Sequence, residues 1–277
     1  MEPNNNPQNN NGEFDLPIEM FRFSDRVNSV NLKIPRVNNG FVEQNKEITY
    51  SEIDEMGIYE GDILLGSVEE IEKAKNNVVA RGITIDGQTF RWGKQVGGII
   101  REVIVPFVTL SALEQTVNNA ISHWEQHTPI RFVKRTDEVD FISFESLNGC
   151  FSQVGRKGGK QVISLGFGCG LGAAIHEIGH ALGLFHEQSR EDRDSFIEVI
   201  ASNIRPEALH NFDKQILNAT DQGPYDFGSI MHYPAKAFSI NGQDTIRAKG
   251  GQPIGQRTGL SAGDIAAIRK IYPDLNW

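Results

Sequence analysis

The chain is short of cysteine, of long apolar runs and of positive charge. It has 2 cysteines among 277 residues. No apolar stretch approaches the roughly 18 residues that a helix needs to cross a bilayer. Asp and Glu number 36 against 27 Lys and Arg, so the net charge is −9 and no cationic surplus is present to neutralise nucleic-acid phosphates. We therefore expect neither a membrane span nor nucleic-acid binding.

The most informative segment that is present is HEIGHALGLFHE, which runs from His176 to Glu187. On a helix each residue advances by about 100°, so His176 and His180 lie one turn apart on one face and can reach the same metal ion. Glu177 lies beside this pair without sharing its direction. That position suits a general base that takes a proton from water rather than a metal ligand. The segment indicates the zinc site of a peptidase.

The third histidine of the segment needs a break in the helix. On a continuous helix His186 would lie about 15 Å along the axis from His176 and about 80° away from its face, too far to share the ion. Gly183 resolves this, because glycine readily takes the left-handed conformation that ends a helix and turns the chain back. His186 can then complete a three-histidine zinc site with a position open for water, which is typical of catalytic zinc. H-E-x-x-H alone also occurs by chance in exposed helices, but Gly183 and His186 make chance a poor explanation.

A second motif, YDFGSIMHY, covers residues 225–233. Together the two motifs resemble the astacin family of the metzincin metallopeptidases, which carry H-E-x-x-H-x-x-G-x-x-H and then a tight turn with a methionine, here Met231, under the metal histidines. Astacins have glutamate after the third histidine, and Glu187 stands there. Serralysins would show proline at that place together with glycine-rich calcium repeats, and matrixins would carry a prodomain cysteine, so both are weaker fits.

The resemblance implies a fold, a cofactor and further site residues. The implied fold is α+β: a two-lobed metzincin-type catalytic domain with a twisted mixed sheet, a backing helix and the active-site helix, preceded by an N-terminal pro-segment. The implied cofactor is one catalytic Zn²⁺. In the mature form Tyr233 would be a further zinc ligand that swings away to support the oxyanion; a buried tyrosine beside the turn is the alternative. Cys150 and Cys169 would form a disulfide, which implies an oxidising compartment; two reduced buried thiols are the alternative.

The N-terminal third holds a motif that resembles astacin propeptides. Tyr59-Glu60-Gly61-Asp62 matches the family's aromatic-x-Gly-Asp pattern, in which the aspartate binds the zinc in place of water. This implies a latent proenzyme in which Asp62 blocks the zinc, with a propeptide at 1–81 and the catalytic domain at 82–277. The acidic surplus agrees with such a division, because residues 1–81 carry a net charge of −7 and the remainder −2. A plain turn at Gly61-Asp62 is the alternative.

Activation of such a proenzyme requires a cut by another protease. The bond Arg81–Gly82 is our first choice, although a neighbouring cut such as one after Ala80 stays open. The resemblance implies that the new amino terminus folds inward and meets Glu187, since a buried ammonium needs a partner of opposite charge.

The first residues do not read as a signal peptide. Met1-Glu2-Pro3 lacks the expected order of basic, apolar and small residues, so either a leader was removed or export is the wrong inference. Residues 4–12 are polar and rich in asparagine, and we expect them to form a disordered tether. Because the implied disulfide requires an oxidising compartment, we expect the protein to be secreted or otherwise extracytoplasmic.

Periodicity gives a coarse set of elements for the catalytic part. We expect a helix capped by Ser111 and a C-terminal helix that begins with a capping-box-like sequence at Ser261. The predicted strand at 161–165 is expected to form the edge of the substrate-binding cleft and to pair with an extended substrate. The predicted strands are 102–109, 130–134, 139–144 and 161–165. The predicted helices are 111–126 and one that starts at 261–264 and runs through about Ile271.

The sequence thus predicts a zinc-dependent endopeptidase that hydrolyses peptide bonds in protein or peptide substrates and that is monomeric. Glu177 would take a proton from the attacking water and pass it to the leaving amine. The alternative is a catalytically silent zinc-containing binding or adhesion module, which would be expected to lose this base. His123 and His127 also lie one turn apart, but without an adjacent glutamate or a third ligand we expect them on the helix surface or in packing contacts.

Overall fold

The computed structural model describes residues 24, 26–37, 41–74, 90–214 and 220–277. The expected tether at 4–12 and the expected cut at Arg81–Gly82 lie outside the described residues. The strands are β1 (Val27–Val37), β2 (Phe41–Ile53), β3 (Met56–Tyr59), β4 (Ile63–Ser67), β5 (Gln95–Val96), β6 (Ile99–Ile100), β7 (Ile104–Thr109), β8 (Arg131–Lys134), β9 (Phe141–Glu145), β10 (Cys150–Ser152), β11 (Lys160–Leu165), β12 (Ile197–Val199) and β13 (Ile246–Ala248). The α-helices are α1 (Val68–Ala74), α2 (Glu114–His127), α3 (Leu171–Leu182) and α4 (Ala262–Ile271), and the short 3-10 helices are Ser111–Leu113, Glu187–Ser189, Arg193–Ser195, Ala201–Asn203 and Pro206–Phe212.

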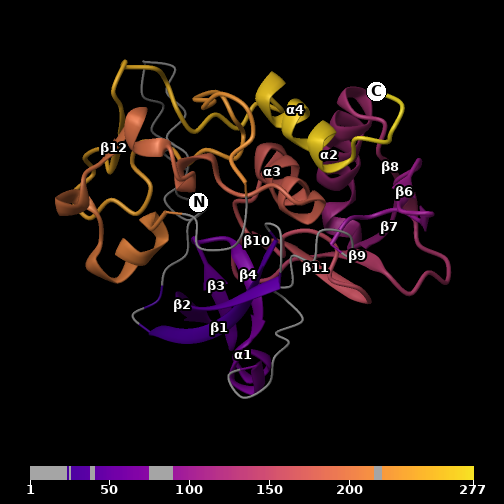
Figure 1. The fold of residues 1–277 in the computed structure, drawn as a ribbon, viewed down its shortest axis with the longest axis horizontal. Coiled ribbons are helices and arrows are strands. Elements are labelled where there is room, and N and C mark those ends of the chain that lie inside the picture. Colours follow the sequence, from indigo (N-terminus) through magenta and orange to yellow (C-terminus); the bar gives the residue numbers. More distant parts are fainter. Residues whose placement is uncertain (1–23, 25, 38–40, 75–89, 215–219) are drawn as a thin grey trace, which may run out of the picture.

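A mixed sheet of nine described strands runs through the molecule in the order β1-β2-β3-β4-β10-β11-β9-β7-β8. Strands β7, β8, β9 and β11 run parallel to their neighbours in this group, whereas β10 is antiparallel to β11. Helices α2 and α3 pack against each other (Figure 1). Their apolar faces join those of the strands in the largest core, where Trp124 and Ile178 are fully buried. These elements are the backing helix and the active-site helix on a mixed sheet that the sequence predicts.

A second core lies in the part of the chain after α3, which is drawn in orange on the left of Figure 1. Between α3 and α4, the described residues form 3-10 helices and the small β12–β13 pair rather than long helices or strands. Its aromatic residues, among them Phe212, Tyr233 and Phe238, pack edge to face or tilted against one another. Because the two cores are separate, the catalytic part has two lobes, as expected for the α+β fold.

The N-terminal segment folds into strands β1 to β4 and helix α1 around a core of its own. That core includes Tyr50, Tyr59 and Ile71, and Val154 and Phe185 from the rest of the chain pack against it. Strand β4 lies parallel to β10, with Ile63 opposite Ser152. The segment therefore extends the sheet of the catalytic part, at the bottom of Figure 1.

The strands and helices that periodicity predicts in the catalytic part are all confirmed within two or three residues, but two details were wrong. Ser111 does not cap the helix with its side chain, because the chain enters α2 through the 3-10 helix Ser111–Leu113. Strand β11 is not an edge strand along the cleft, because it lies between β10 and β9 in the sheet. After Gly149, whose φ is 118°, the short strand β10 folds back along β11 and separates it from β4. The capping box of α4 is confirmed, since Ser261 and Asp264 each accept the other's backbone N–H.

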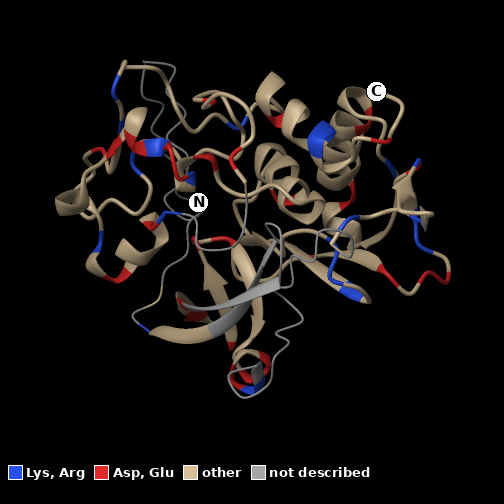
Figure 2. Ribbon diagram, viewed as in Figure 1, with Lys and Arg blue, Asp and Glu red and all other residues tan. Residues whose placement is uncertain are grey.

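Charged side chains are dispersed rather than gathered by sign. Figure 2 shows Lys and Arg interspersed with Asp and Glu over most of the ribbon, with acidic residues prominent on α1. In the described part of the chain, no helix is both long and apolar enough to cross a membrane.

Cys150 and Cys169 form the expected disulfide, which ties β10 to the approach of α3 across a sequence separation of 19. Replacing both with serine is expected to lower the free energy of unfolding by about 3 kcal/mol, because a loop of this length is no longer closed in the unfolded chain. Urea unfolding of the double variant Cys150→Ser/Cys169→Ser measures the loss. The unmodified protein, unfolded with a reductant present, is expected to match the variant, and an unchanged midpoint in the variant would contradict the prediction.

Candidate metal centre

Helix α3 brings the first two histidines of the motif together at its buried face. The ring centroids of His176 and His180 are 4.7 Å apart, and both side chains are at most 2% exposed. His176 donates its Nδ1–H to the carbonyl of Ile230 at 2.8 Å, and His180 donates to the carbonyl of Leu184 at 2.8 Å. Because carbonyls only accept, these bonds place the proton on Nδ1 and leave the lone pair of Nε2 available for a metal.

Gly183 ends α3 and turns the chain toward the third histidine. Its φ is 114°, and its N–H bonds to the last carbonyls of the helix. A Cβ at this position would lie 3.2 Å from the ring of Phe90, so both backbone and space favour glycine. The turn brings the ring centroid of His186 to 4.7 Å from that of His180 and 5.4 Å from that of His176.

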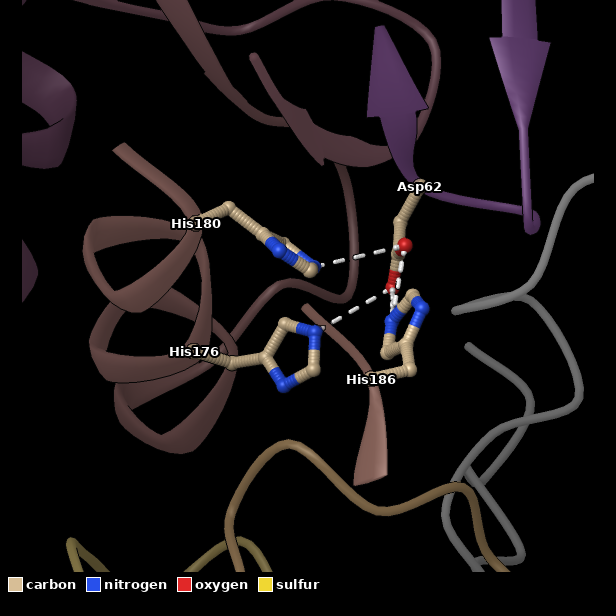
Figure 3. A group of neighbouring side chains, drawn as sticks. All are labelled: Asp62, His176, His180 and His186. Carbon is tan, nitrogen blue, oxygen red and sulfur yellow. Dashed lines mark hydrogen bonds and ion pairs between the residues drawn. The ribbon is translucent and has the colours of Figure 1, made fainter. Parts of the chain in front are cut away.

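Asp62 completes a four-residue cluster with these histidines (Figure 3). Its carboxylate oxygens lie 3.3 Å from Nε2 of His176, 3.5 Å from Nε2 of His180 and 3.0 Å from Nε2 of His186. Ligands about 2.0–2.1 Å from a tetrahedral zinc are about 3.3 Å apart, so the spacing fits that ion. Within the described residues, the buried Nε2 atoms of His176 and His180 have no hydrogen-bond partner, which a metal ion would provide.

The electrostatics of the cluster favour a positive charge at this place, although they shift the pKa values of its histidines in different directions. Burial lowers the pKa of His176 to about 3, so its ring is neutral, as metal binding requires. Burial also opposes a charge on His186, but Asp62 and Glu60 outweigh it and raise the pKa of His186 to about 9. Glu60 reaches Nδ1 of His186 at 2.7 Å while Asp62 faces Nε2. The two carboxylates therefore make this buried place suited to a cation.

Glu177 follows the first histidine on α3 and is 1% exposed. Its Oε2 has no hydrogen-bond partner among the described residues. Burial, with the nearby charge of Asp62, raises the pKa of this carboxyl well above its usual range. A raised pKa makes a carboxylate a stronger acceptor of protons, as a general base requires.

The turn that carries the methionine lies directly beneath α3. Sδ of Met231 would lie 2.9 Å from a Cβ at Gly179, so the thioether packs closely against the helix backbone. Asp264 holds this turn from α4, accepting from the hydroxyl of Ser229 at 2.6 Å and from the N–H of Ile230 at 3.0 Å. The sequence indicates Asp264 only as a capping residue, so its second contact was missed.

The turn also carries Tyr233, which lies beside the cluster, and His232. The hydroxyl of Tyr233 donates to the backbone carbonyl of Glu60, and its ring lies 4.8 Å from that of His186. His232 donates Nδ1–H to the carbonyl of Tyr233 and accepts from the hydroxyl of Tyr225, so it belongs to the turn. His123, on α2, accepts the N–H of Leu260, which is the packing contact expected of it.

Glu187 lies next to the cluster and is held by its own neighbours. Its carboxylate accepts the N–H of Asp226 at 2.7 Å and lies 3.2 Å from the guanidinium of Arg190. Burial raises the pKa of Glu187 to about 7 although both contacts lower it. The expected partner, a new amino terminus at Gly82, lies outside the described residues.

The fold and the three-histidine centre together define a zinc metalloendopeptidase of the metzincin type. The model of the astacin peptidase family matches residues 104–273. High choriolytic enzyme 2 from Oryzias latipes is 43% identical over 190 residues, which are 65% of this chain and 67% of that protein. The astacin-like metalloendopeptidase of Mus musculus is 36% identical over 250 residues, which are 86% of this chain and 52% of that protein. The chain belongs to the astacin family.

A solved structure agrees with the assignment. High choriolytic enzyme 1 from Oryzias latipes, described as a hatching enzyme zinc-protease, superimposes with a TM-score of 0.61 at 42% identity. The match covers 67% of this chain and 96% of that structure. About a third of the present chain therefore has no counterpart in the hatching enzyme, whereas nearly all of the hatching enzyme has a counterpart in the present chain.

Proposed function

We propose that this chain is a latent zinc endopeptidase, with a propeptide at 1–81 and a catalytic domain at 82–277. In this proposal His176, His180 and His186 hold the zinc, and Asp62 takes the fourth position that water needs. The observation that carries it is the approach of the Asp62 carboxylate to all three Nε2 atoms at 3.0–3.5 Å. Asp62 is 4% exposed, so water has little access to the same place.

The backbone around Asp62 supports a second level of blockage. The carbonyl of Asp62 accepts the N–H of Ser152 at 2.9 Å, where β4 meets β10. This bond uses a backbone donor on the side of β10 that faces away from β11. An extended substrate that adds to the sheet needs unpaired backbone N–H and C=O groups on the strand it joins. The N-terminal segment thus covers both the metal centre and a strand on which a substrate can dock.

After removal of this segment, the remaining residues can perform peptide hydrolysis. Zinc, when bound, supplies a Lewis acid that acidifies water and polarises a carbonyl. Glu177 accepts a proton from the attacking water and delivers it to the leaving amine. Tyr233 loses the Glu60 carbonyl as an acceptor, and in this proposal its hydroxyl would donate to the oxyanion or bind the metal. The Nδ1–H bonds of His176 and His180 remain, because their acceptors belong to the catalytic domain.

The proposal includes a place of action and an activation step. The Cys150–Cys169 disulfide supports a secreted or otherwise extracytoplasmic protein. An activating protease would cut Arg81–Gly82, and the new amino terminus would then pair with Glu187. Protein or peptide substrates are expected, and the protein is expected to be a monomer.

Limited tryptic digestion tests the proposal. The purified chain is assayed on a general protein substrate before and after digestion, with and without a zinc chelator, and the new amino terminus is sequenced. The expected result is activity that appears only after digestion and is lost with chelator, in a chain that begins at or near Gly82. Full activity before digestion would contradict the latent state. Absence of proteolytic activity in every sample that retains zinc would favour a binding module instead.

A further inference from the structure

The N-terminal segment contributes two buried carboxylates to the metal centre, and the role proposed above uses only Asp62. The second is Glu60, whose side chain is 1% exposed. Its Oε2 lies 2.7 Å from Nδ1 of His186, while Asp62 lies 3.0 Å from Nε2 of the same ring. His186 is therefore held at both nitrogens by residues of one short turn.

The backbone of this turn is shaped to insert both carboxylates. Glu60 has a φ of 45° and Gly61 a φ of 74°, so two successive residues are left-handed. Such a conformation is unfavourable for a non-glycine residue and persists only where surrounding contacts hold it. Here Tyr233 binds the carbonyl of Glu60, and a Cβ at Gly61 would lie 2.6 Å from the ring of Phe238. These contacts hold the side chain of Glu60 in its buried position beside His186.

His186 differs from the other two histidines in what accepts its Nδ1–H. His176 and His180 donate to backbone carbonyls of the catalytic domain. His186 donates to a carboxylate, and that carboxylate comes from the segment that activation removes. A carboxylate in this position fixes the tautomer and orientation of a metal-bound histidine and raises its basicity. Glu60 and Asp62 also bring two negative charges to a buried site that binds a divalent cation.

We propose that Glu60 is a positioning residue of the latent centre, which strengthens zinc binding through His186 and is withdrawn on activation. This inference rests on the proposed latent state. It makes the propeptide a zinc-retaining device as well as a block: the uncut chain holds its metal more tightly than it would with Asp62 alone. Removal of the propeptide leaves the Nδ1–H of His186 without its carboxylate.

The variant Glu60→Gln tests this with the uncut chain. The glutamine carbonyl can still accept from Nδ1–H, so the substitution removes the charge and keeps the shape. Loss of an outer-shell carboxylate lowers metal affinity by about 10–100-fold. We therefore expect the uncut variant to release zinc to an excess of chelator about 10-fold or more faster than the unmodified uncut chain, with zinc release followed by a metal-sensitive dye.

Two controls isolate the contact. Glu69→Gln removes a carboxylate of the same segment whose side chain is 77% exposed on α1, and it is expected to release zinc like the unmodified chain. After activation and removal of the propeptide, the Glu60 variant and the unmodified protein are the same molecule, so their release rates must coincide. A difference in the activated forms would show damage elsewhere and would overturn the assignment to Glu60.

The visible spectrum of the Co²⁺-substituted uncut chain supplies a second readout. A change in the donor strength of His186 shifts the d–d bands, so Glu60→Gln is expected to differ from both the unmodified chain and Glu69→Gln. Equal zinc release and equal spectra in an uncut chain that is latent would overturn this inference and leave the Asp62 block intact. If the unmodified uncut chain is already active, the latent state fails, and the role of Glu60 fails with it.

Discussion

Replacing Glu177 with glutamine is expected to remove most peptide-bond cleavage from the activated enzyme while the zinc stays bound. A positioned general base contributes about 10²–10⁴-fold to such a reaction. Glu177 is buried beside the histidine cluster but is not one of the four residues that can hold the metal. Glutamine has a similar shape and cannot take the proton. We therefore expect kcat/KM on a fluorogenic peptide to fall by at least about 100-fold.

Metal content separates this chemical effect from a structural one. Zinc bound per chain is expected to be unchanged in Glu177→Gln, because the proposed ligand atoms come from three histidines. Glu114→Gln, on the exposed side of α2 and paired with Lys134, serves as the matched control and should retain full activity. Normal turnover in Glu177→Gln would sink the assigned role, and a parallel loss of zinc would assign Glu177 to the support of the site.

The sequence predicts well that the three histidines lie together, because their placement is local. His176 and His180 share a face through helix periodicity alone, and one left-handed glycine decides where the chain goes next. Strand and helix positions in the catalytic part follow from the same short-range patterns. These are the features for which neighbouring residues carry all the necessary information.

Contacts between distant segments are where sequence reasoning fails. Asp264 lies 34 residues from Ile230, and nothing in its capping-box pattern indicates that its carboxylate also holds the methionine turn. Glu60 lies 126 residues from His186, and its position in the propeptide motif gives no sign of a bond to Nδ1. The three-residue strand β10 is too short for periodicity to reveal, so the cleft was placed at β11. Such features are set by packing between elements.

The sheet explains how the proposed propeptide can block the site. Strands β1 to β4 have their own core, and β4 then continues the sheet beside β10. A folded unit of this kind presents the turn at Glu60–Asp62 in one fixed direction. The cost of ordering the turn is met when the unit folds, so the carboxylates need no further ordering to reach the metal centre.

Replacing Asp62 with alanine is expected to activate the chain without any cut. Alanine cannot occupy the fourth zinc position, so water and substrate gain access to it. Breaking a buried charged contact costs about 3 kcal/mol or more, which corresponds to a rise of about 100-fold in the population of chains with an open centre. We expect peptide cleavage by the uncut Asp62→Ala chain to rise by about that factor. It should stay below the activity of the cut enzyme, because β4 still covers β10.

The comparison requires that no chain is cut during the assay. Arg81→Ala is therefore placed in both the variant and its reference, and a gel after each assay verifies the intact length. Glu69→Ala in the same background is the matched control, since it removes an exposed carboxylate from the same segment and should leave the chain silent. An intact Asp62→Ala chain as silent as its reference would show that Asp62 is dispensable for latency. The pairing of β4 with β10 would then be the block, and a substitution that weakens that pairing would be the one to release activity.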